Sequence, residues 1–210
     1  MRPPTAEDLD PTAFIDSDSE TVRGFVERVA DGARDEHEVV ARLFAAVRDG
    51  IRYDPWNVSG DPADYRGSAV LRMDRGYCVQ KSVALTAAAR AAGIPSRLGF
   101  ADVRNHLQSE RLRAAMGTDL FIWHGYSVFF VGGRWTKASC AFNAELCARF
   151  GVDPLDFDGT QDALLHPFSG DGSTYMEYVR ERGIYTDLPL GTMLADLART
   201  YGGRARDQSA

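Results

Sequence analysis

Apolar residues recur at intervals of three and four along the first half of the chain, a spacing typical of amphipathic helices. Helix-capping residues precede two of these stripes, Ser19 before the first and Asp35 before the second. The pattern predicts a helix that opens at residues 19–21, a second helix over 35–48, a helical turn over 68–73 and an alanine-rich helix that runs from Cys78 to a stop at Gly93.

After Pro95 the pattern changes to runs of β-branched and aromatic residues, which favour strands. Gly132-Gly133 separates two such runs and predicts a two-residue hairpin turn. We expect strands over 96–103, 121–131 and 134–142, loops over 105–118 and 152–172, and closing helices over 175–182 and 192–201. Helices first and an antiparallel sheet afterwards predict an α+β domain.

Composition narrows the class of protein. A chain of 210 residues, 44% of them hydrophobic, can bury one substantial core without a second domain. A net charge of -6 argues against a nucleic-acid partner, and the lack of a long apolar run argues against a membrane partner. The start of the chain has no apolar stretch typical of a signal peptide, and the three cysteines fit no disulfide framework, so we expect a cytoplasmic protein.

Cys78 carries the strongest chemical indication. It follows Gly76 and Tyr77 at the expected start of a helix, where backbone N–H groups lack partners and the helix dipole is positive. That setting favours a thiolate, which is the nucleophilic form of cysteine. Gln80 in the same turn is either an oxyanion-stabilising donor or an ordinary exposed helix residue, and the second interpretation is favoured.

His124 is the histidine best placed to act as a base. It lies between Trp123 and Gly125 at the start of a hydrophobic strand, where a core position would favour an apolar residue. The three other histidines lie in polar segments, where surface roles are expected: His37, His106 and His166.

The predicted hairpin suggests partners for the His124 ring. If Val131 faces Arg134, His124 lies on the same face as Ser139 and Asn143. Asp102 ends the preceding strand, whose antiparallel pairing would bring it near His124. A carboxylate best stabilises an imidazolium, so Asp102 is the first choice, Asn143 is an alternative and Ser139 is the weakest.

These motifs together resemble the transglutaminase-like superfamily, bacterial type. The resemblance rests on Gly76-Tyr77-Cys78, the helix exit Gly93-Ile94-Pro95-Ser96-Arg97, His124 before a strand, Gly133 with Trp135, and the lead-in Ile51-Arg52-Tyr53-Asp54. It implies a papain-like fold, in which a helix bearing cysteine packs on an antiparallel sheet bearing histidine, and acyl transfer through a Cys-His-Asp triad. The implied organisation is an extended arm over 1–19, a core over 20–143 and an extension over 144–210 packed on the same domain.

One position departs from the family pattern. Ser139 stands where the resemblance implies an aspartate. One hypothesis is that Asp102 or Asn143 replaces that aspartate, and the preferred catalytic set is then Cys78, His124 and Asp102. The other hypothesis is that the triad is degenerate and the domain only binds peptides. A peptide, protein or small amide or thioester is the expected substrate, a biosynthetic acyltransferase or cyclase acting on a thioester is a further alternative, and no cofactor or metal is expected.

Overall fold

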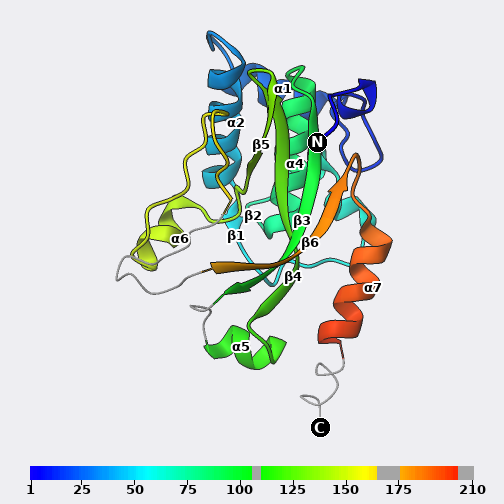
Figure 1. Cartoon of the computed structure of the whole chain (residues 1–210), viewed down its shortest axis with the longest axis vertical. Helices are drawn as coiled ribbons and strands as arrows, with labels where there is room; N and C mark the ends of the chain where they lie inside the picture. The colour runs from blue at the N-terminus through cyan, green and yellow to red at the C-terminus, as the bar shows by residue number, and fades with distance from the viewer. Residues whose placement is uncertain (106–109, 165–175, 203–210) are drawn as a thin grey trace.

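The computed structural model describes residues 1–105, 110–164 and 176–202. Its centre is helix α4 (Cys78–Ala91), which packs against one face of a four-stranded antiparallel sheet (Figure 1). Further helices surround α4 on the side away from the sheet. This arrangement confirms the predicted α+β, papain-like class.

The remaining elements follow in chain order. The helical elements are η1 (Ala6–Asp8), α1 (Glu20–Val29), α2 (Glu36–Gly50), η2 (Pro62–Tyr65), α3 (Gly67–Val70), α5 (Glu110–Met116), α6 (Ala144–Arg149) and α7 (Leu190–Tyr201). The strands are β1 (Arg52–Tyr53), β2 (Arg75–Gly76), β3 (Ser96–Asn105), β4 (Leu120–Val131), β5 (Arg134–Ala138) and β6 (Met176–Tyr185). Across these described ranges, no helix has both the length and the apolar character needed to cross a membrane.

The sheet has the strand order β5-β4-β3-β6, and every neighbouring pair is antiparallel. The predicted hairpin is confirmed, because Val131 pairs with Arg134 across Gly132 and Gly133, whose φ angles are +59° and +75°. The strand after the turn is shorter than expected, since β5 ends at Ala138.

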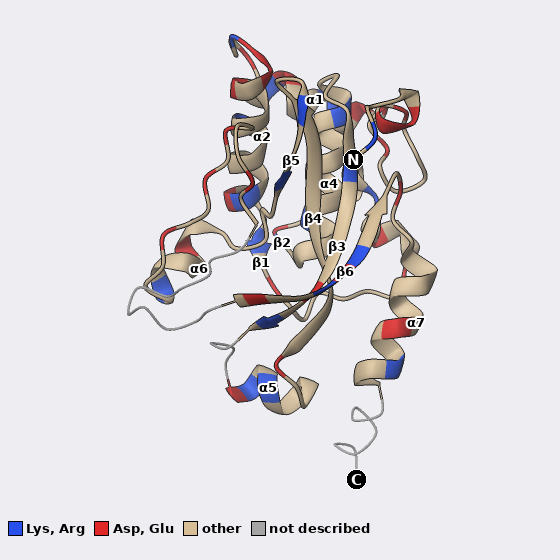
Figure 2. Ribbon diagram, in the orientation of Figure 1, with Lys and Arg blue, Asp and Glu red and all other residues tan. Residues whose placement is uncertain are grey.

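The segment 175–182 was expected to be a helix, but its described part, residues 176–182, lies in strand β6. It pairs with β3, from Leu98 opposite Tyr185 to Asn105 opposite Met176. Figure 2 shows charged residues of both signs along β6, as is common for an exposed edge strand. The sequence did not reveal this strand because charged residues dominate the segment and it carries little periodicity. It forms a strand because the backbone groups along the edge of β3 require hydrogen-bond partners.

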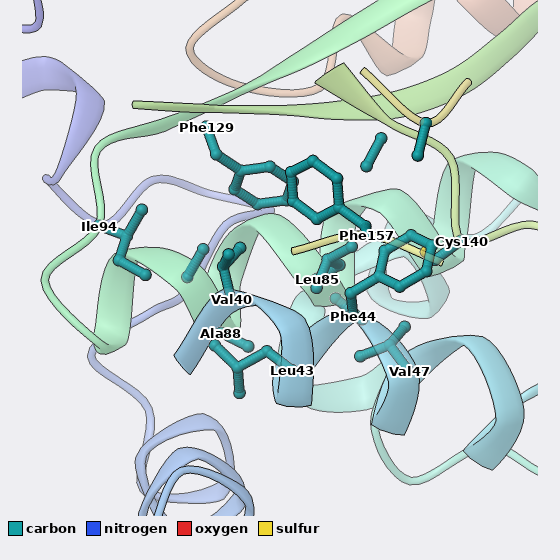
Figure 3. Close-up of a cluster of buried hydrophobic side chains, with 14 of the residues drawn as sticks. Val40, Leu43, Phe44, Val47, Leu85, Ala88, Ile94, Phe129, Cys140 and Phe157 are labelled. Atoms are coloured by element: carbon teal, nitrogen blue, oxygen red, sulfur yellow. The ribbon is translucent and has the colours of Figure 1, made fainter. Parts of the chain in front are cut away.

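Helix α4 is buried on nearly every side, from Cys78 to Arg90. Its alanines allow close approach of its neighbours, and Figure 3 shows side chains of α2 on one side and Phe129 of β4 on the other. Lys81, in the first turn of α4, is fully buried. Its ammonium group donates hydrogen bonds to the backbone carbonyls of Arg48, Ile51 and Ala141 at 2.8, 2.6 and 2.9 Å. These bonds fix the N-terminal turn of α4 to the end of α2 and to the segment that follows β5.

The first 19 residues contact both the sheet and the helices, and two of their buried residues are Asp8 and Ile15. Asp8 is fully buried and accepts two hydrogen bonds from Arg97, at 2.6 and 2.8 Å. Ile15 is also fully buried, in the cluster that contains Cys78. Arg97 therefore serves in a structural ion pair.

Candidate active site

The backbone around Cys78 is held by a buried amide side chain. Tyr77 precedes α4 in an extended conformation, and its N–H donates to Gln80 Oε1 at 3.2 Å, while Gln80 Nε2 donates to the Asp64 carbonyl at 3.1 Å. Gln80 is fully buried, so the favoured interpretation of an exposed residue was wrong. Because its amide is already bonded in this way, Gln80 shapes the helix start.

Strand β4 lies directly against the start of α4. A Cβ atom added at Gly125 would lie 3.0 Å from Val79 Cα and 3.3 Å from the Cys78 carbonyl oxygen, so only glycine fits this contact without displacement. The Gly125 N–H also acts to lower the pKa of the Cys78 thiol, against the effect of burial. His124 is the residue before Gly125, and its side chain and that of Cys78 line one cavity of about 520 Å³.

Burial keeps both reactive side chains neutral. It raises the pKa of the Cys78 thiol from 9.0 to about 11, although N–H groups of Gly125, Val79 and Cys78 itself act in the opposite direction. It also lowers the pKa of His124 from 6.5 to about 4. This runs against the thiolate expected from the helix start, because loss of solvation outweighs the N–H groups.

The His124 ring contacts the residue ranked last among its expected partners. Its Nε2 atom lies 3.3 Å from Ser139 Oγ, and both residues are buried. Asn143 instead uses its Oδ1 atom to accept a hydrogen bond from the Tyr53 N–H at 3.1 Å. Ser139, which stands in the sequence where the resemblance implies an aspartate, is thus the residue that contacts the His124 ring.

Asp102 lies near His124 along the backbone but its carboxylate bonds elsewhere. Ala101 pairs with His124, and the ladder is irregular at Asp102. The Asp102 carboxylate accepts hydrogen bonds from the Trp123 N–H at 3.1 Å and from Arg182 Nε. Among the described residues no hydrogen bond joins Asp102 to His124, so the predicted contact is corrected: the irregular pairing directs this carboxylate toward β6.

The Asp102 carboxylate belongs to a network that holds Trp123 in a strained conformation. Trp123 has φ of +59°, which is uncommon for an aromatic residue and costs about 1–3 kcal/mol. Its indole N–H donates to Asp196 of α7 at 2.9 Å, and Arg182 donates to the same Asp196 at 2.6 Å. The Arg182 guanidinium also lies 5.0 Å from the centroid of the Trp123 ring.

Sequence reasoning missed Arg182, because residues 175–182 were expected to form a helix, and it gave no role to Asp196 in the expected helix 192–201. A buried aspartate within a strand did indicate a cationic partner. Nothing in the local pattern identified which of the many arginines would be the partner of Asp102.

Comparisons with known proteins give one family match and similar solved structures. Residues 23–140, more than half of the chain, match the transglutaminase-like superfamily. A "putative cysteine protease" from Cytophaga hutchinsonii has a similar structure, with a TM-score of 0.49 and 14% identity over 87% of this chain and 51% of that one. A "putative protease" from Parabacteroides distasonis gives a TM-score of 0.41 and 21% identity over 74% of this chain and 31% of that one.

The chain therefore spans about half the length of the first of these structures and about a third of the second. The comparison with curated proteins gives no match. The match over residues 23–140 includes the Cys78 helix start and the His124 strand. The chain belongs to the transglutaminase-like superfamily.

Proposed function

We propose that the protein is a cysteine-dependent acyl-transfer enzyme in which Cys78 is the nucleophile and His124 is the base. Membership of the superfamily supports a cysteine-dependent enzyme in general terms. The observation that carries the specific assignment is the close approach of Gly125 to the start of α4, which brings Cys78 and His124 to the lining of one cavity.

The chemistry starts from a neutral thiol and a neutral imidazole. With His124 Nε2 beside Ser139 Oγ, Nδ1 is the nitrogen left to receive the thiol proton. Proton transfer accompanies attack of the sulfur on an amide or thioester carbonyl, whose π electrons move to oxygen. Backbone N–H groups in the first turn of α4 can stabilise that oxyanion.

Collapse of the tetrahedral intermediate then breaks the bond to the leaving group. The departing amine or thiol takes the proton from the His124 imidazolium, and a thioester remains on Cys78. Water or an amine then attacks this thioester with His124 again acting as the base, so that the acyl group leaves and the Cys78 thiol is restored. Water gives hydrolysis and an amine gives transamidation.

Trapping of the acyl-enzyme tests this proposal. Intact-mass spectrometry after brief mixing with a p-nitrophenyl ester should show one added acyl group on the wild type and none on Cys78→Ala, and His124→Gln should slow its formation. The matched control is Cys140→Ala, because Cys140 is buried and does not line the cavity. Acylation of Cys140 or Cys147 in preference to Cys78 would refute the assignment.

A non-catalytic binding module is the second candidate. Ser139 in place of a carboxylate and the neutral resting state of both reactive groups favour it. In that case the wild type would bind acyl compounds reversibly in the cavity and give no covalent adduct with any activated ester.

A further inference from the structure

The cavity that Cys78 and His124 line has mostly apolar and aromatic walls. Its sides come from residues 53–58, from β4, from α5 through Leu112 and Met116, and from α7 through Met193 and Leu197. Apart from the reactive pair Cys78 and His124, the described residues that line it include no Asp, Glu, Lys or Arg. Its volume of about 520 Å³ is within the range of pockets that enclose small organic ligands.

The polar tips of several lining side chains are already bonded within the protein. The Tyr77 hydroxyl donates to the Tyr65 hydroxyl at 3.1 Å, and the Tyr201 hydroxyl donates to the Leu120 carbonyl at 2.8 Å. The Trp123 indole N–H donates to Asp196 at 2.9 Å. These side chains therefore present their rings to the cavity and leave few polar atoms for a ligand.

We propose that this cavity is an acyl-binding pocket that accepts uncharged, apolar acyl groups and rejects acyl groups that carry a carboxylate. The inference rests on the proposed function, since it places the carbonyl at Cys78 and the rest of the acyl group along the cavity. An apolar group gains by leaving water, and an anion entering the cavity would lose its hydration without meeting a Lys or Arg among the described lining residues.

Much of this selectivity would come from outside the segment that defines the family. Helix α7 lies beyond residues 23–140, and it supplies Met193, Leu197 and Tyr201 to the cavity. Arg111 of α5 lies with its guanidinium carbon 5.8 Å from the centroid of the Trp56 ring, but this exposed residue is not part of the cavity lining.

A series of p-nitrophenyl esters tests the pocket through turnover. From acetyl to octanoyl, kcat/KM should rise about fourfold for each added methylene until the cavity is filled. Esters of equal length that end in a carboxylate should react about 100-fold more slowly. A flat chain-length series, or equal rates for charged and uncharged esters, would overturn the proposal.

A positive charge introduced into the cavity wall should change the selectivity between charged and uncharged esters, which a general loss of stability would not do. Leu112→Lys should narrow the difference between carboxylate-ended and uncharged esters about tenfold, because the ammonium supplies the missing partner. Ala114→Lys is the matched control, since Ala114 is exposed on the same helix and does not line the cavity; its selectivity should equal that of the wild type. Equal effects of the two substitutions would refute the pocket.

Binding separates failure of the pocket from failure of the chemistry. Trp56 and Trp123 line the cavity, so their fluorescence can report titration of Cys78→Ala with octanamide or with the carboxylate-ended amide of equal length. If the wild type forms no acyl-enzyme but Cys78→Ala prefers octanamide, the proposed function fails and the pocket stands. If acylation occurs and neither binding nor turnover discriminates between the two ligands, the pocket is wrong.

Discussion

Replacing Ser139 with aspartate would return a carboxylate to the place where the family pattern has one. Ser139 Oγ is 3.3 Å from His124 Nε2, so a carboxylate there would accept a charge-assisted hydrogen bond from the imidazolium. We expect Ser139→Asp to accelerate acylation of Cys78.

The size of the effect follows from the pKa values of the two reacting groups. The values of about 11 for Cys78 and about 4 for His124 differ by about 7 units, which corresponds to about 10 kcal/mol for proton transfer before the attraction between the ions. A carboxylate at this distance raises an imidazole pKa by about 1–3 units. The barrier should fall by about 1–4 kcal/mol, a gain of about 10- to 1000-fold in the acylation rate.

The assay is the burst of p-nitrophenol from an ester with an apolar acyl group, followed by stopped-flow absorbance. Ser139→Asn is the matched control because it has nearly the same shape and no charge. Ser139→Asp should also be less stable to heat than Ser139→Asn, since position 139 is only 5% exposed and solvates a carboxylate poorly. If Ser139→Asp acylates no faster than Ser139→Asn, the reasoning about the resting proton state is refuted.

Three further predictions address the framework of the site. Gly125→Ala should lower the free energy of unfolding by about 1–3 kcal/mol and kcat by about 100-fold, because its Cβ would meet Val79 Cα at 3.0 Å. Gly24→Ala, with no atom near its Cβ, is the control in thermal unfolding and kinetics, and equal behaviour of the two variants would contradict the close contact. The pKa of about 4 for native His124, against 6.5 in the unfolded chain, should contribute about 3 kcal/mol of stability that is present above pH 6.5 and lost as the pH falls to 4. Denaturant unfolding across this pH range should show this loss in the wild type but not in His124→Gln. If the free energy of unfolding falls equally with pH in both proteins, the buried imidazole is not neutral. Asp102→Asn should destabilise the protein by about 1–3 kcal/mol and lower kcat with little change in KM, because Arg182 keeps only Asp196 as an anionic partner and the Trp123 N–H is left with an uncharged acceptor. Calorimetry with steady-state kinetics checks this, and an unchanged kcat would show that Asp102 does not position His124.

The sequence was informative wherever one local pattern had a single structural solution. Gly132-Gly133 between two β-rich runs leaves little choice of turn, and the observed pairing of Val131 with Arg134 follows from it. The same is true of Ser19, whose side chain caps α1 by accepting from the Val22 N–H at 3.3 Å.

Long-range contacts and side-chain directions were not open to the same reasoning. The sequence places Asp102 near His124, and the backbone pairing agrees, but an irregularity in the ladder turns the carboxylate away. Gln80 has a high helix propensity on any surface, and only the tertiary fold buries it against Tyr77 and Asp64. Both errors arise because neighbours distant in the chain decide where a polar side chain finds its partner.

The position of α7 links the reacting groups to the choice of acyl group. Asp196 of α7 accepts hydrogen bonds from Trp123 and Arg182, and Arg182 bonds to Asp102, so α7 helps to hold the strained residue that precedes His124. Met193 and Leu197 of the same helix form part of the cavity wall. A displacement of α7 must therefore change the shape of the cavity and the support of His124 together. For this reason, substitutions at Asp196 should alter chain-length preference and kcat in parallel, whereas substitutions at Leu112 on α5 should alter the preference alone.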